Sequence, residues 1–186
     1  MQTNSELESF LMGLGDRGMS IEGLNTVESY IRACWDKGVE VVLDHSMTEA
    51  FGTYDPSINI LTIGGPALEC DTELMETIEH EFIHVLQDQL DGLENSQMTP
   101  LGLPINANGF VQVDANYAHL DPAQQALELE AHSAESMIQA GHPSMQKCCD
   151  PLEQQVVAGY VTNGVDLIEA SIQATVQTPL IESLLG

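Results

Sequence analysis

One uninterrupted stretch constrains the fold of this chain more than any other feature. Residues 73–90 contain no Gly or Pro, so nothing in them breaks a helix. At about 100° per residue, their apolar side chains cover a broad arc, formed by Leu74, Met75, Ile78, Phe82, Val85, Leu86 and Leu90. The pattern predicts a helix over residues 71–91 that is buried on most sides. Asp71 or Thr72 is expected to cap its start, and Gly92 to end it.

The polar strip opposite this arc carries the pattern H-E-x-x-H, in which His80 and His84 lie one helical turn apart. Two imidazoles so placed can reach one Zn²⁺ ion at roughly 2.0–2.1 Å each. Glu81 follows the first histidine, where its carboxylate can take a proton from metal-bound water. The pattern predicts a catalytic zinc site with His80 and His84 as ligands and Glu81 as general base. The alternative is a solvated pair of histidines on an exposed helix face.

Composition limits the classes of protein and partner. A chain of 186 residues with 43% apolar residues is long enough for a core, and we expect a single domain over 1–186. The formal net charge is −25, with only four basic residues, and such a surface repels nucleic-acid phosphates and anionic lipid. No run of 18 apolar residues predicts a membrane span, and the acidic N-terminus lacks a basic signal segment. We therefore expect a cytoplasmic protein without nucleic-acid or membrane partners, and leave its oligomeric state open.

Residues 38–66 read as the β-rich part of an α+β fold. Three short runs favour strands, Val39–Leu43, Phe51–Tyr54 and Ile58–Ile63, with a turn signal before the last. They predict two or three antiparallel strands packed on the H-E-x-x-H helix. The last strand could border a cleft and pair with an extended peptide. The alternative is a plain structural hairpin.

Helices are expected on both sides of this core. Ser5–Leu14 predicts a short helix that is broken by Gly13, Gly15 and Gly18, and Asn25–Lys37 predicts a longer one. After a long loop, in which Phe110–Val113 reads as a short strand, Asp121 and Pro122 predict the start of a helix over 121–140. Further short helices are expected after Asp150, which makes the C-terminal half mostly helical.

A catalytic zinc site needs a third protein ligand, and the 121–140 helix offers four candidates: Glu128, Glu130, His132 and Glu135. A helical projection places Glu130 within the apolar arc and the other three together on the opposite side. A carboxylate on an apolar face is costly unless it is paired or bound to metal. We predict Glu130 as the third ligand and keep Glu128 as the second candidate. The alternative is that Glu130 pairs with one of the few basic residues.

The run from His80 to Gln89, HEFIHVLQDQ, resembles the zinc metallopeptidases called zincins, and within them the glutamate-ligand branch, the gluzincins. It is similar to bacterial and archaeal sequences with H-E-x-x-H, then L-Q-D-Q, then E-G-x-A or E-A-x-A. Glu130 falls at the matching place, with Ser133 where that pattern has Ala. The resemblance implies a zincin-like fold with His80, His84 and Glu130 as zinc ligands and Glu81 as base.

The resemblance also implies a function and its rivals. The implied reaction is hydrolysis of peptide bonds in a peptide or protein substrate through a zinc-activated water. A gluzincin carboxylate that supports the ligands would fall at Ala134, so Glu135 or Asp88 is the substitute candidate. Tyr117 or His119 could stabilise an oxyanion, although packing or surface roles are favoured. The alternatives are an inactive zincin-like metal-binding or assembly module, and an acidic structural protein whose motif is accidental. Four cysteines without C-x-x-C spacing give no zinc ribbon.

Overall fold

The computed structural model describes residues 1–92 and 97–140 and divides the chain into two compact units, Met1–Leu101 and Gly102–Gly186. The helices predicted after Asp150 lie outside the described residues, and the single-domain organisation stays a prediction. Among the described residues, no helix combines the length and the apolar character that crossing a membrane requires.

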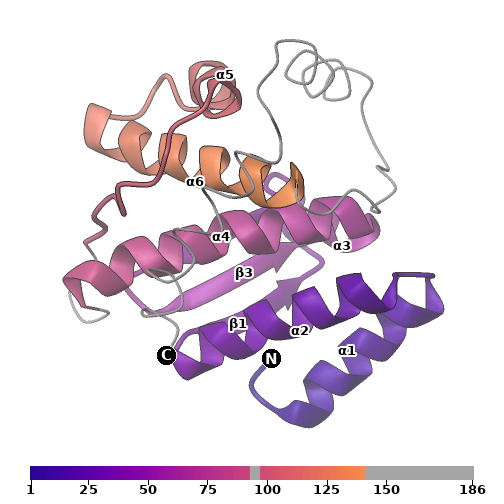
Figure 1. Cartoon of the computed structure of the whole chain (residues 1–186). Coiled ribbons are helices and arrows are strands. Elements are labelled where there is room, and N and C mark those ends of the chain that lie inside the picture. Colours follow the sequence, from indigo (N-terminus) through magenta and orange to yellow (C-terminus); the bar gives the residue numbers. More distant parts are fainter. Residues whose placement is uncertain (93–96, 141–186) are drawn as a thin grey trace. The chain divides into compact units, whose positions relative to one another are not determined.

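The first unit is α+β (Figure 1), as predicted. Its elements in chain order are α1 (Asn4–Asp16), α2 (Ile21–Asp36), β1 (Glu40–Asp44), β2 (Gly52–Asp55), β3 (Ile60–Gly64), α3 (Gly65–Glu69) and α4 (Asp71–Asp91). Helix α1 begins with a capping box between Thr3 and Glu6. It continues through Gly13 and Gly15, so the breaks expected at these two glycines are wrong, and it ends at Asp16, before Gly18. Helix α2 begins four residues before the expected start, because Ser20 caps the backbone N–H of Gly23.

The sheet is mixed, with strand order β1–β3–β2. β2 pairs antiparallel with β3, while β1 pairs parallel with it in the register Val41 to Leu61. The prediction of an antiparallel sheet is therefore wrong for β1. The suggested pairing of the last strand with an extended peptide is also wrong, because β3 is the central strand and both of its edges are paired. Among the described residues, no further strand pairs with the outer edge of β2.

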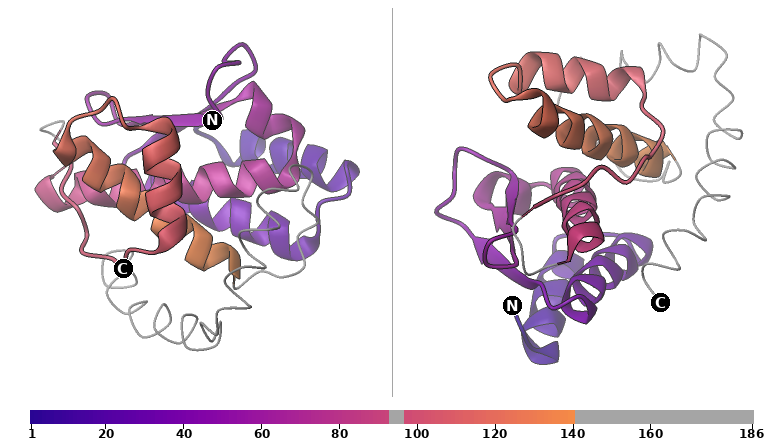
Figure 2. Two further views of the ribbon diagram at one scale, coloured as in Figure 1. Left: turned by 90° about the horizontal axis from the view of Figure 1, so that it is seen from above. Right: turned by 90° about the vertical axis from the view of Figure 1, so that its left-hand side faces the viewer.

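One face of the sheet carries the core. Val41, Leu61 and Ile63 share that face and are each at most 1% exposed. Helices α2 and α4 pack on this face, and α1 packs against α2 (Figure 2). Because side chains alternate along a strand, Gly52 and Tyr54 of β2 also point to the helix side. The edge strand thus lies directly against α4.

Helix α4 matches the predicted range 71–91. Its C-terminal cap is Gly92, as expected, with a φ of 85° that glycine adopts without a steric penalty. The expected N-terminal cap is wrong: Cys70 holds the cap position, and Asp71 and Thr72 lie inside the first turn. The Asp71 carboxylate there faces the positive end of the helix dipole and bonds Arg17 at 3.2 Å.

The described part of the second unit contains α5 (Ala107–Asn116) and α6 (Pro122–Ala140). Asp121 caps α6 by accepting from two backbone N–H groups, as its sequence predicted. The short strand expected at Phe110–Val113 is wrong, since these residues lie inside α5. Asn106 caps α5, and a Cβ on Gly109 would stand 2.2 Å from Ser133 Oγ, so α5 packs on α6 more closely than any other residue type would allow.

Candidate metal centre

Helix α4 buries an unusual number of polar groups. Glu79, His80, Glu81 and His84 are between 1% and 8% exposed, and Gln87 and Asp88 are fully buried. Polar groups in the interior need hydrogen bonds or bound ions to offset the loss of water. The burial of both histidines rules out the alternative of a solvated pair on an exposed helix face. The buried histidines, carboxylates and amide of α4 therefore need such partners.

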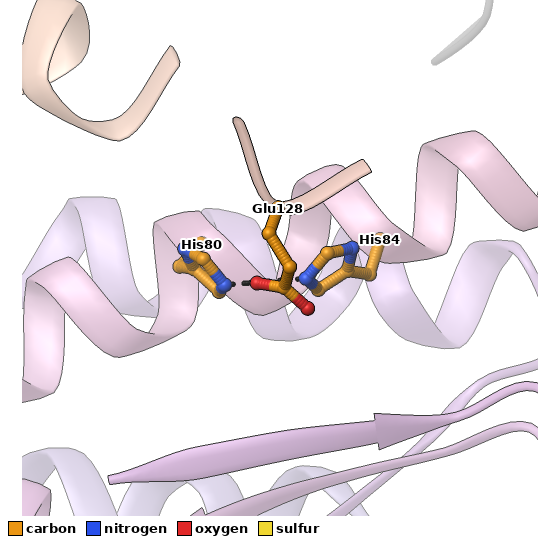
Figure 3. Close-up of side chains that lie close together, drawn as sticks. All are labelled: His80, His84 and Glu128. Atoms are coloured by element: carbon orange, nitrogen blue, oxygen red, sulfur yellow. Dashed lines mark hydrogen bonds between the residues drawn. The ribbon is translucent and has the colours of Figure 1, made fainter. Parts of the chain in front are cut away.

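The two histidines form a close pair on one side of α4 (Figure 3). Their Nε2 atoms lie 3.2 Å apart, and their ring centroids are 4.8 Å apart with the rings near perpendicular. Each ring therefore aims its Nε2 at the same small volume. The four-residue spacing on the helix produces this convergence, as the sequence predicted.

This spacing fits a shared metal ion. Two nitrogens bound to one tetrahedral zinc at roughly 2.0–2.1 Å must lie about 3.3 Å apart, and the observed Nε2–Nε2 distance is 3.2 Å. Metal binding would need only small movements of the two rings. The pair could therefore hold a metal ion through its Nε2 atoms.

A buried hydrogen bond orients one of the rings. His84 Nδ1 lies 2.7 Å from Gln87 Oε1, one turn further along α4. A metal-ligating histidine usually donates its other ring N–H to such an acceptor. The ring of His84 is thus held with Nε2 toward His80.

Glu81 lies where α4 meets the edge strand. A Cβ placed on Gly52 of β2 would stand 3.1 Å from Glu81 Cγ and 2.4 Å from Thr77 Cγ2. The side chain of Glu81 is 7% exposed and follows His80 directly on the helix. The predicted base is therefore a buried carboxylate between the histidine strip and the sheet edge.

Asp88 ties the same strand to α4 one turn after His84. The hydroxyl of Tyr54 donates to Asp88 Oδ2 at 2.6 Å, and Asn59 lies 3.2 Å from the same hydroxyl. Burial and the neighbouring Asp88 carboxylate raise the pKa of Tyr54 well above its usual range. Asp88, a candidate to support the ligands, anchors the β2 edge through Tyr54.

In the second unit, Glu130 lies on the buried side of α6, as its projection predicted, and is 2% exposed. Its Oε1 accepts from the backbone N–H of Leu103 at 2.7 Å. Nearby, the N–H of Asn106 donates to Ser133 Oγ on the same part of α6. The segment of the second unit that contains Leu103 and Asn106 therefore covers this side of α6. An N–H donor at Leu103 accounts for one oxygen of Glu130 and was not visible in the sequence.

The opposite side of α6 carries the other candidate ligands. Glu128 and Glu130 are two residues apart, which separates them by about 200° around a helix. Glu128, His132 and Glu135 are all partly buried on that side. His132 Nδ1 pairs with Glu135 Oε2 at 3.1 Å, and the ring of Tyr117 lies against His132. His119, the other candidate for an oxyanion, is exposed.

Comparison of the chain with protein-family models, with curated proteins and with solved structures finds no match. The resemblance to zincins therefore rests on the H-E-x-x-H run and its context. The described residues support a candidate metal site on α4, and the chemistry at that site is a proposal.

Proposed function

We propose that this chain is a zinc-dependent peptidase whose metal centre is built on His80 and His84. The observation that carries the proposal is the buried pair of Nε2 atoms at a separation that fits one tetrahedral ion. Two neutral imidazoles and a carboxylate form a donor set that suits zinc. A zinc ion held there would supply a Lewis acid for the scissile carbonyl and would acidify a water molecule.

We propose Glu128 rather than Glu130 as the third ligand. The side of α6 that carries Glu130 is covered by residues of its own unit, and Leu103 already donates to its carboxylate. Glu128 lies on the other side of the helix, together with His132 and Glu135. The assignment requires the second unit to present this side of α6 to α4.

Glu81 is the base in this proposal. Its carboxylate accepts a proton from the attacking water as the C–O bond forms, and returns it to the amine nitrogen as the C–N bond breaks. Its place beside His80 and against strand β2 gives it little freedom to move, which suits a group that must hold one proton at one position.

Three substitutions and one control variant test the assignment. Glu81→Gln should keep zinc but lose hydrolysis of a broad peptide library. The control is Glu69→Gln, which makes the same change at an exposed glutamate before α4 and should alter neither zinc binding nor hydrolysis. Glu128→Gln should weaken zinc binding, and Glu130→Gln should leave zinc binding intact. Peptide cleavage by purified Glu81→Gln would refute its role as base.

A chelator separates the peptidase from the inactive metal-binding module. Cleavage that stops on chelation and returns with zinc supports the peptidase. Wild-type protein that binds zinc but cleaves no peptide in the library would instead support a binding or assembly module.

A further inference from the structure

Gln87 is a fully buried amide that the proposed chemistry does not use. It follows His84 by three residues on α4, so its side chain lies over the same face of the helix. Its Oε1 lies 2.7 Å from His84 Nδ1, and its backbone carbonyl accepts from the N–H of Thr99 at 3.0 Å. Both ends of the residue are therefore held in place, which makes it a rigid partner for the imidazole.

The hydrogen bond decides where the proton on His84 resides. A carboxamide oxygen only accepts hydrogen bonds, so Nδ1 must carry the hydrogen. A neutral imidazole has one N–H, and Nε2 is then left with its lone pair. That lone pair faces His80 Nε2 at 3.2 Å.

The two histidines are consequently not equivalent before metal binds. Because His84 Nε2 accepts, the N–H in the bond between the rings belongs to His80 Nε2. His84 already presents a lone pair to a metal ion, whereas His80 has to move its proton to Nδ1 or release it. Gln87 determines this difference between the two histidines through a single hydrogen bond.

We infer that Gln87 is the positioning residue of the metal centre: it fixes the Nδ1–H tautomer and the ring orientation of His84. The part of this inference that concerns zinc rests on the proposed function, and the part that concerns the tautomer does not. A neutral amide fixes the ring without adding a further negative charge beside Glu81 and the proposed carboxylate ligand. Partners of this kind typically contribute about 10–100-fold to metal affinity.

The first test reads the tautomer directly in zinc-free protein, by long-range ¹H–¹⁵N correlation of the histidine rings at a pH where they are neutral. Wild type should show Nδ1–H on His84 and Nε2–H on His80. Gln87→Met, which has similar length but no strong acceptor, should lose the Nδ1–H preference of His84. Gln87→Glu keeps an acceptor oxygen and should restore it.

Gln89→Met is the matched control. Gln89 lies on the same helix but about 180° from His80 around its axis, so the tautomers should stay as in wild type. Nε2–H on His84 in the wild-type protein would overturn the inference, whether or not Gln87→Met folds. An unchanged tautomer in folded Gln87→Met would overturn it as well.

The second test measures zinc affinity by competition with a chromophoric chelator. Gln87→Met should bind zinc about 10–100-fold more weakly than wild type, and Gln87→Glu and Gln89→Met should stay within a few-fold. Equal affinities of wild type and Gln87→Met would refute the role of Gln87 in metal binding. Absence of zinc binding in wild type would refute the proposed function, while the tautomer test would still decide the positioning role.

Discussion

The close approach of β2 to α4 leads to a prediction for Gly52→Ala. The added Cβ would stand 2.4 Å from Thr77 Cγ2 and 3.1 Å from both Glu81 Cγ and the carbonyl oxygen of Thr62. Overpacking of this kind typically costs about 1–3 kcal/mol. Removing a glycine returns about 0.4–1 kcal/mol through the unfolded chain. We expect a net loss of about 1–2 kcal/mol in the free energy of unfolding.

Urea unfolding followed by the fluorescence of Trp35, the only tryptophan of the chain, reports this loss for the first unit. Gly13→Ala is the matched control, since its Cβ would meet nothing within 4 Å. In the interior of α1 it should stabilise by about 0.5–1 kcal/mol. The two substitutions are therefore expected to change the free energy of unfolding in opposite directions.

A double-mutant cycle identifies the clashing atom. Thr77→Ser removes Cγ2 and keeps the hydroxyl, so Gly52→Ala should cost about 1 kcal/mol less in that background than in wild type. If Gly52→Ala is as stable as wild type, or if its cost is the same with Ser at position 77, the strand does not pack on α4 as described.

Two further outcomes concern the first unit, and a third concerns the charge of the whole chain. Tyr54→Phe should lower the free energy of unfolding by about 1.5–3 kcal/mol, measured by the same urea titration, because it removes a hydrogen bond to a buried carboxylate. Burial raises the pKa values of Tyr30 and Tyr54, and that of Cys34 to about 12. As the pH rises, these groups lose their protons in the unfolded chain before they do in the folded protein, at about pH 8.5 for Cys and about pH 10 for Tyr. Stability should therefore decline from about pH 8.5 upward, and a flat profile to pH 11 would contradict this. The net charge of −25 predicts a higher melting temperature in 1 M salt than in 0.01 M, where the Debye length is about 30 Å, and equal values would contradict that.

Helix α4 and its histidine pair were predictable because local information determines them. The apolar arc, the absence of Gly and Pro and the glycine at position 92 all indicate the same helix, and helical geometry then fixes how His80 faces His84. The buried position of Glu130 was predictable for the same reason, since helical periodicity alone separates it from Glu128.

The predictions that were wrong concern features that depend on contacts between distant segments of the chain. β1 pairs parallel with β3, and no local sequence pattern indicates which strand β1 pairs with or in which direction. Phe110–Val113 has the composition of a strand, but packing of Gly109 on α6 and the cap from Asn106 favour a helix. Glu130 accepts from a backbone N–H, which every residue except proline carries, so no sequence pattern indicates that Leu103 donates to it.

The central claim is that His80 and His84 hold one zinc ion, and elemental analysis of protein purified without an affinity tag tests it most directly. We predict close to one zinc per chain for the wild type and almost none for His84→Ala, with matching far-ultraviolet circular dichroism to show that the variant folds. A metal-free wild type that also takes up no added zinc, or a folded His84→Ala that retains its zinc, would contradict the claim.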